Sequence, residues 1–340
     1  MKVWYTKGLS NTAHAMRLIR QDPLGGAIRL LGSHVDPANA VSAAADEFIL
    51  EPVSVSDAAY AEWCLQTAIE REIDLVIPQR RPGALWAIRD RFFEAGIALH
   101  AAAAPEVLRI LDRKDLFGIE MEKIGVPSPD FETFRTLVEF DEAVERMRSE
   151  GRAPDGLCVK PAVGIFGSGF RILKDEVCDM DRMMVLDNLE ISFGLYRAVL
   201  AASRQDRDMM LMRYLPGPER SVDFLACNGT LVAAVARVKE GATQRLETEG
   251  ASIEIARILA HHFGLSGQCN LQTREADGEE IILEINPRMS GGMQMSCLSG
   301  VNLPLWDVLT ALGLRDASEI PLPRPGSRVR MREEPAIVTD

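Results

Sequence analysis

The residues best suited to bind a metal ion lie in one stretch of the chain, residues 267–292. Glu284 and Asn286 stand two positions apart in an alternating apolar–polar run, so in a strand both side chains point to the same face. Gln272 lies on the preceding run, across a hairpin from them. All three side chains offer oxygen ligands, which suit a hard cation such as Mg²⁺ and do not suit zinc.

The length of the hairpin loop decides whether these three side chains can meet. Asp277-Gly278 is a hairpin signal, and a strict two-residue turn would place Gln272 and Glu284 on opposite faces. A three-residue loop over 276–278 would pair Gln272 with Ile282 and bring it onto the face of Glu284. A metal site therefore predicts an odd loop or a bulge. The alternative is an ordinary hairpin with a solvated polar face.

A second candidate site is a lysine beside a glycine-rich loop. Lys160 interrupts the apolar run 157–161, and the loop 162–169 follows it before a further strand at 170–173. Backbone N–H groups of such a loop can approach a phosphate closely while the ammonium supplies charge. The Walker A pattern is absent, so this is not a P-loop. The glycines and serine of the loop that we assign to phosphate binding are Gly164, Gly167, Ser168 and Gly169.

Lys114 is the third feature that points to an anion. It lies in the first turn of a predicted helix for which Asp112 is a fair N-cap and which Gly125 closes. The helix dipole does not favour a cation at that end, as is expected if the side chain serves a bound anion. An exposed surface lysine is the alternative.

The bulk composition sets the class of protein. The chain has 340 residues, 47% of them hydrophobic, which is enough for two or three domains. A net charge of −12 argues against nucleic-acid binding. Neither a long apolar run nor a signal peptide is visible, and the six cysteines are dispersed, so we expect a cytoplasmic protein without a membrane partner.

The first part of the chain predicts parallel βαβ units. Short apolar strands at 3–5, 27–31, 48–50, 75–77 and 98–99 alternate with helices at 13–21, 57–73 and 83–95. Ligands in such sheets bind at the carboxyl ends of the strands, which makes Arg80 a candidate for an anionic substrate group. No G-x-G-x-x-G follows the first strand, so a dinucleotide site is not indicated.

The last part predicts a second hairpin, a helix at 251–263 and a further helix at 305–312. Strands at 219–226 and 231–239 flank Asn228-Gly229, and a last strand is expected over 328–338. Arg237 and Arg245 follow this hairpin and could clamp a substrate, or could be exposed strand-end cations. The flexible turn after residue 288 adds Gly291 as a candidate contact.

Several of these stretches, in order, resemble motifs of the ATP-grasp superfamily. The likeness is to the branch with the carbamoyl phosphate synthetase large chain, biotin carboxylase and the carboxylate–amine ligases. The stretches that carry it are 112–115 with 125–127, 159–161 with the glycines to 169, 212–215 with 217–219, 270–272, and 284–288. The resemblance implies a mixed α/β fold: a parallel pre-ATP-grasp domain (1–112), a small lobe (113–212), and a large lobe with a C-terminal tail (213–340).

The resemblance also implies a role for each residue. Lys114, Lys160 and the glycine loop would bind the ATP phosphates, with the loop as a lid, and Arg288 would stabilise the transferring phosphoryl group. Gln272, Glu284 and Asn286 would bind Mg²⁺, or Mn²⁺ in its place. The residues that would bind the nucleoside are Arg213, Tyr214 and Leu215 at the adenine and Glu219 at the ribose. The family usually has an acidic residue where Arg213 stands, so the resemblance implies a contact to adenine through the backbone of this segment.

The implied activity is two-step ligation. A carboxylate attacks the γ-phosphate of ATP, and an amine then displaces phosphate from the acyl phosphate to form an amide. One alternative is phosphorylation of bicarbonate or carbamate, and another is an ATP-binding sensor without catalysis. The partners expected are small-molecule carboxylates and amines, and relatives of this kind often form homodimers through the N-terminal domain.

Overall fold

The computed structural model describes residues 1–8, 11–164, 167–186, 188–203 and 207–332. These residues divide into two compact units, each assembled from segments that are distant in the sequence. The first unit holds Met1–Leu108, Arg220–Gln272 and the chain from Ile285 onward, and the second holds Arg109–Glu219 and Thr273–Glu284. The predicted division into three consecutive domains stays an interpretation.

The first unit begins with a five-stranded sheet in the order β3-β2-β1-β4-β5, and all its strand pairs are parallel. The order reverses between β1 and β4, because β2 and β3 lie on one side of β1 while β4 and β5 lie on the other. The strands are β1 (Lys2–Tyr5), β2 (Arg29–His34), β3 (Glu47–Leu50), β4 (Leu75–Ile77) and β5 (Ala98–Leu99). The predicted parallel α/β start is confirmed.

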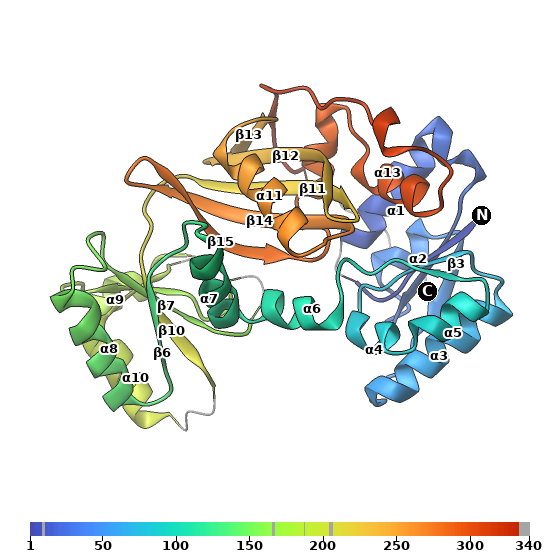
Figure 1. Ribbon diagram of the computed structural model, residues 1–340. Helices are drawn as coiled ribbons and strands as arrows, with labels where there is room; N and C mark the ends of the chain where they lie inside the picture. The colour runs from blue at the N-terminus through green and yellow to red at the C-terminus, as the bar shows by residue number, and fades with distance from the viewer. Residues whose placement is uncertain (9–10, 165–166, 187, 204–206, 333–340) are drawn as a thin grey trace. The chain divides into compact units, whose positions relative to one another are not determined.

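Helices cover both faces of this sheet (Figure 1). Val3 and Tyr5 of β1 pack in the same core cluster as α1 and α2, whereas Trp4 between them packs with α3 and α5 on the opposite face. Alternate side chains of a strand point to opposite faces, so an uninterrupted apolar strand is what a sheet covered on both sides requires. The helices are α1 (Asn11–Gln21), α2 (Ala40–Ala44), α3 (Asp57–Glu70), α4 (Pro82–Trp86) and α5 (Arg89–Glu94), with a 3-10 turn η1 (Pro23–Ala27).

The second unit contains another five-stranded sheet, in the order β6-β10-β7-β8-β9. Phe140 of α8 and Leu200 of α10 pack on one face of it, with Phe134, Val159 and Leu211 from its strands. The strands are β6 (Phe131–Phe134), β7 (Leu157–Pro161), β8 (Arg171–Lys174), β9 (Glu190–Ser192) and β10 (Met209–Arg213). The helices are α6 (Pro105–Asp112), which crosses the boundary between the units, α7 (Lys114–Ile124), α8 (Leu137–Ser149), α9 (Asp179–Met183) and α10 (Phe193–Ala202).

A six-stranded sheet in the order β15-β14-β11-β12-β13-β16 follows. The hairpin predicted at Asn228-Gly229 is confirmed: both residues have positive φ, 47° and 80°, between β11 and β12. The strands are β11 (Glu219–Cys227), β12 (Thr230–Glu240), β13 (Thr243–Glu247), β14 (Gly267–Ala276), β15 (Glu279–Asn286) and β16 (Arg328–Val329). The helices are α11 (Ala251–His262), α12 (Met293–Ser296) and α13 (Leu303–Ala311), with 3-10 turns η2 (Cys297–Ser299) and η3 (Ala317–Glu319).

The loop between β14 and β15 has two residues, so the three-residue loop that the metal hypothesis predicts is absent and the ordinary hairpin turn is observed. Asp277 and Gly278 have φ of 54° and 78°, and β15 begins directly after them. Positive φ at both central residues defines a type I′ turn, the form whose twist matches that of the flanking strands. The local Asp-Gly signal therefore determines this turn.

Four other predicted elements differ from the structure. The helix expected over 83–95 is two short helices, and Asp112 ends α6 and does not cap α7, whose N-cap is Arg113. The charged, methionine-rich stretch 175–188 predicts a surface helix, but it contains only the short α9, and residue 187 lies outside the described residues. The last strand has only two residues, and part of its predicted range, from 333 on, also lies outside them. No helix in the described part of the chain is long and apolar enough to cross a membrane.

Candidate functional site

Lys114 and Glu284 form an ion pair inside the second unit. The Lys114 Nζ lies 3.2 Å from Oε2 of Glu284 and donates a hydrogen bond of 2.7 Å to the carbonyl of Gly164. The backbone N–H of Lys114 also donates to the carbonyl of Ala162, at 2.9 Å. The first residue of α7 therefore connects a proposed metal ligand to the glycine loop.

Lys160 carries its charge next to this pair. Burial lowers the pKa of Lys160 to about 8; the Glu284 carboxylate raises it, and the Lys114 ammonium lowers it further. The lowered pKa is mainly the cost of removing the ammonium from water, which the Glu284 carboxylate offsets only in part. Two lysines share one glutamate, so this part of the second unit carries an excess of positive charge and could bind an anion.

Two glycines of the loop between β7 and β8 adopt a backbone conformation that other residues rarely adopt. Gly167 and Gly169 have φ of 65° and 77°, the left-handed region that favours glycine. A Cβ on Gly169 would also lie 2.9 Å from the ring of Pro161. Ser168 is exposed, and Gly164 lies at the start of the loop; residues 165–166 are outside the described residues.

The side chain of Arg213 is held away from a base-recognition role. Its Nη2 lies 2.6 Å from Asp155 and 2.6 Å from Asp277, the first residue of the hairpin turn. The backbone N–H of Tyr214 donates to the carbonyl of Gly156 at 2.9 Å. The Arg213 side chain therefore ties the end of β10 to the β14–β15 turn.

Arg274 holds the neighbouring nucleoside candidates. It donates 3.0 Å to the carbonyl of Leu215 and lies 3.3 Å from Oε2 of Glu219. Leu215 is buried in a small apolar cluster with Ala276 and Ile281. The sequence pattern does not single out Arg274, because it lies between Gln272 and the turn as one polar residue of an alternating run.

In the first unit, Asn286 and Arg288 contact each other. Arg288 Nη2 donates to Oδ1 of Asn286 at 2.9 Å, and Nη1 donates to the carbonyl of Met289 at 3.3 Å. Gln272 is half-buried on β14, and Gly291 is exposed, with open space where a Cβ would stand. The ligand oxygens of Glu284 and Asn286 belong to different units, so the complete ligand set stays a prediction.

The donor chemistry of these residues fits magnesium. Among the described residues, no three His, Cys, Asp or Glu side chains are grouped so as to hold a metal ion by themselves. Mg²⁺ commonly binds through one or two carboxylates, with substrate phosphates and water completing its octahedron. A single glutamate with the amide oxygen of Asn286 matches that pattern. The two-residue turn between β14 and β15 counts against Gln272 as a third ligand, because it pairs Gln272 with Leu283 and turns it away from the face of Glu284.

Arg237 is buried, so the alternative that it is an exposed cation is wrong. Its guanidinium lies 2.9 Å from Oδ2 of Asp223, and both side chains are at most 4% exposed. The remaining hydrogen bonds go to Gln244, Ser221, Ser290 and Ser296. A Cβ on Gly292 would clash with this guanidinium. Arg237 therefore holds β11, β12 and the chain after β15 together.

The other two substrate candidates also have partners. Arg80 Nη1 lies 2.9 Å from Glu51, a fully buried carboxylate that also accepts hydrogen bonds from Ser33 and Tyr60. Arg245 is about one third exposed and pairs with Glu240 and Glu247 on its own sheet. In the described structure both arginines stabilise strand ends, and a role at a substrate stays a prediction.

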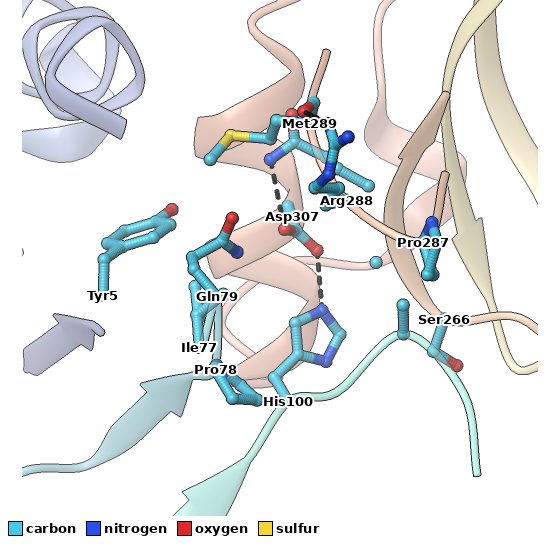
Figure 2. A pocket seen from close by; sticks show the side chains of 13 residues that line it. Tyr5, Ile77, Pro78, Gln79, His100, Ser266, Pro287, Arg288, Met289 and Asp307 are labelled. Carbon is cyan, nitrogen blue, oxygen red and sulfur yellow. Dashed lines mark hydrogen bonds and ion pairs between the residues drawn. The ribbon is translucent and has the colours of Figure 1, made fainter. Parts of the chain in front are cut away.

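An unpredicted pair joins the sheet of β1–β5 to α13. His100 Nε2 lies 2.7 Å from Oδ1 of Asp307 (Figure 2). Burial alone would lower the pKa of His100, but the Asp307 carboxylate raises it above its usual value. Gln268 donates to the other carboxylate oxygen at 3.2 Å. The sequence carries no local signal for this pair, because Asp307 stands in an apolar helix and His100 follows a two-residue strand.

A family model and a curated relative both match parts of this chain. A family model described as "ATP-grasp in the biosynthetic pathway with Ter operon" matches residues 205–335. The carbamoyl phosphate synthase large chain of Clostridium beijerinckii is 24% identical over 299 residues, covering 79% of this chain. That alignment covers only 25% of the relative, so the chain spans about a quarter of its length.

Solved structures extend the likeness over nearly the whole chain. The ADP complex of purK, an N5-carboxyaminoimidazole ribonucleotide synthetase, has a TM-score of 0.67 at 13% identity and covers 96% of this chain and 78% of its own. An L-amino acid ligase from Bacillus licheniformis has a TM-score of 0.61 at 13% identity and covers 94% and 75%. Over residues 205–335 the chain is therefore similar to an ATP-grasp family, and over most of its length it shares the fold of these two enzymes.

Proposed function

We propose that this protein is an ATP-dependent ligase that activates a carboxylate as an acyl phosphate and joins it to an amine. The observation that carries the proposal is the cluster of Lys114, Lys160 and Glu284, where two ammonium groups face one carboxylate and burial lowers the pKa of Lys160 to about 8. A triphosphate would supply the missing negative charge. The similarity to an amino acid ligase and to a carboxyaminoimidazole ribonucleotide synthetase supports the reaction class.

Each residue has a task that follows from its chemistry. Lys114 and Lys160 neutralise phosphate oxygens, and backbone N–H groups of the loop 164–169 bind them. Arg288 neutralises the charge that develops on the transferred phosphoryl group. Because Arg213 is engaged by two aspartates, we assign the edge of the adenine to the Tyr214 carbonyl and the Leu215 amide, and the ribose hydroxyls to Glu219.

Glu284 and Asn286 would hold Mg²⁺, with Mn²⁺ as a substitute, and the two-residue turn makes Gln272 the weakest of the three ligands expected from the sequence. A divalent cation bound to the phosphates supplies charge neutralisation that lysines alone provide only in part. The pair between Lys114 and Glu284 then has a second consequence. If Glu284 held the cation, the Lys114 ammonium that now pairs with it would be available to a phosphate oxygen. The reaction takes place in the cytoplasm, where ATP and magnesium are both abundant.

One other reaction has support of its own. The curated relatives that match are carbamoyl phosphate synthase large chains, at 24% and 22% identity. Their name favours bicarbonate or carbamate as the phosphorylated group in place of a larger carboxylate. Both reactions begin with the same attack of a carboxylate oxygen on ATP, so the residues assigned above serve either one.

The test is ADP release on mixing the protein with ATP, Mg²⁺ and a panel of amino acids and dicarboxylates. Hydroxylamine, which converts an acyl phosphate into a hydroxamate, identifies the intermediate directly. We expect ADP and hydroxamate only with a particular carboxylate. ADP release that needs bicarbonate alone would favour the second reaction. Tight ATP binding without turnover on any acid would contradict both and leave a nucleotide sensor.

The matched control is a pair of lysine substitutions in one sheet. Lys160→Met removes a half-buried ammonium beside Glu284, whereas Lys174→Met removes an exposed one on β8 that pairs with Glu190. We expect the first change to raise the KM for ATP at least about tenfold, the effect of losing a charged hydrogen bond of about 1.5–3 kcal/mol. The second should leave that KM unchanged. Equal effects of the two substitutions would contradict the assignment of Lys160.

A further inference from the structure

A small polar cavity lies at the carboxyl ends of the parallel strands of the first unit. Tyr5 ends β1, Gln79 follows β4 and His100 follows β5, and all three line the cavity (Figure 2). The strand order reverses between β1 and β4, and such a switch point is where open α/β sheets bind ligands. The opposite wall includes Arg288 and Asp307. The cavity volume of ≈ 20 Å³ holds about one group the size of a water molecule.

Two buried polar atoms of the lining lack hydrogen-bond partners within the described residues. They are the hydroxyl of Tyr5, which is 0% exposed, and Oε1 of Gln268, which is 7% exposed. A buried polar group without a partner costs about 1–3 kcal/mol, so both atoms are expected to bond to something that enters the cavity. The Asp307 carboxylate fixes the orientation of the Gln268 amide, because Nε2 must donate to it and Oε1 then faces away.

The cavity is lined by the basic side chains of Arg288 and His100 and by the acidic side chain of Asp307, so its unpartnered polar atoms select the occupant more than its net charge does. Asp307 lies 2.7 Å from His100, and its carboxylate raises the pKa of Tyr5 further after burial has raised it. A carboxylate or phosphate would offer no N–H or O–H group to the amide oxygen of Gln268. A small group with several N–H donors would instead satisfy Gln268 and the Tyr5 hydroxyl together.

The His100–Asp307 pair is held in place by the backbone beside it. Gly267 has φ of 80°, and a Cβ there would lie 2.7 Å from Nε2 of His100. The first residue of β14 therefore has to be glycine for the pair to form at this position. A site so closely packed admits only a compact group.

We propose that this cavity binds the nitrogen of the amine that the ligase joins to its activated carboxylate, with Tyr5 Oη and Gln268 Oε1 accepting its N–H bonds. The inference rests on the proposed ligase function and names the subsite for the second substrate. Arg288, which we assign to the phosphoryl group, lines the same cavity, so the amine nitrogen and the activated carboxylate meet at this arginine. The volume selects ammonia or an unhindered primary amino group.

The kinetic test is the single substitution Tyr5→Phe. It removes one oxygen that has no partner in the described structure and keeps the buried ring, so the melting temperature should stay the same or rise. With ammonium chloride, methylamine and glycine as probes, we expect the KM for the amine to rise about five- to tenfold, the loss of one hydrogen bond. The KM for ATP should not change. An unchanged KM for every amine would overturn the proposal.

The matched control is Tyr196→Phe in the second unit. Tyr196 packs in the cluster of α8 and α10 and is not among the residues assigned to catalysis or binding. The chemical change is identical, so we expect no effect on the KM for the amine. A rise equal to that of Tyr5→Phe would overturn the assignment of the cavity. The same amine probes also show whether the nitrogen comes from ammonia alone or from the amino group of glycine.

A second readout does not need turnover. Thermal unfolding is followed in ammonium chloride and in tetramethylammonium chloride at equal ionic strength, because the second cation is too large for a cavity of ≈ 20 Å³. We expect only ammonium to raise the melting temperature, and only while Tyr5 and Gln268 are intact; Gln268→Leu and Tyr5→Phe should abolish the difference. Equal curves for the wild-type protein in both salts would overturn the site. Stabilisation without ADP release would support the site while contradicting the ligase function.

Discussion

The Nζ of Lys114, at the start of α7, lies 3.2 Å from Oε2 of Glu284, near the end of β15. One residue was assigned to phosphate and the other to metal, and in the structure they neutralise each other. In the proposed function a nucleotide and its cation would supply a new partner for each of them, and the ion pair would hold both side chains together until the substrate binds.

Replacing Glu284 with Gln should abolish turnover while the fold persists. The amide is nearly the same size but carries no charge, so it loses both the metal and Lys114. We expect at least about a 100-fold loss in kcat/KM, which is more than about 2.7 kcal/mol of transition-state stabilisation. ADP release and the urea unfolding curve are the measurements. Arg288→Ala should have the same effect on turnover, and wild-type rates in either variant would contradict the site.

Nucleotide binding should depend on pH through Lys160. Its pKa is lowered to about 8 in the unliganded protein, so the ammonium that attracts a phosphate is lost as the pH rises above 8. We expect affinity for ATP to fall between pH 8 and 9.5, with proton uptake on binding that calorimetry in two buffers measures. Lys160→Arg, which keeps its charge, should remove this dependence. A flat affinity profile in the wild-type protein would contradict the prediction.

The lowered pKa of Lys160 should also make the folded protein more stable as the pH rises, whereas the affinity for ATP falls. The unfolded pKa of lysine is near 10.4, so below pH 8 the lysine is charged in both states and the full cost of burying that charge is present. The cost is relieved as the pH rises from 8 toward 10.4. Urea unfolding of wild type and Lys160→Met over this range should show the wild type gaining relative stability.

The pair of His100 and Asp307 should stabilise the folded protein most at low pH, whereas burial of the Lys160 charge destabilises it there. The pKa of His100 is raised in the folded protein, so its contribution is fully present below about pH 6.5 and is lost as the pH rises through the raised value. The difference in unfolding free energy between wild type and His100→Gln measures it. A difference that grows as the pH rises above 6.5 would show that the sign is wrong.

Arg237→Met should destabilise the first unit. The change leaves the Asp223 carboxylate buried and unpaired, which costs about 3–5 kcal/mol in comparable cases. The double variant Arg237→Met/Asp223→Asn removes that charge and should recover part of the loss. Urea unfolding curves of the three proteins provide the comparison. A single variant as stable as the wild type would show that the network of serines and Gln244 does not depend on the arginine.

Much of the fold could be predicted because its signals are local. Parallel βαβ units follow from apolar runs of strand length between helices, and two hairpins follow from Asn228-Gly229 and Asp277-Gly278, where positive φ is needed. Strand β6 and helix α8 were not predicted, although Thr136 and Glu139 form a capping box that marks the start of α8. The Asp-Gly signal leaves the loop length open between two and three residues, and the structure has the two-residue turn that the local signal favours.

The sequence by itself determined which residue types are available and in what order, and that order was enough for the family resemblance. Only the tertiary structure decided what each side chain meets. Arg237 became a buried partner of Asp223, Arg213 was bound by Asp155 and Asp277, and Tyr5 and Gln268 were left to face a cavity. The reason is physical. Local signals depend on neighbouring residues, whereas burial, charge pairing and cavities depend on contacts between segments far apart in the chain.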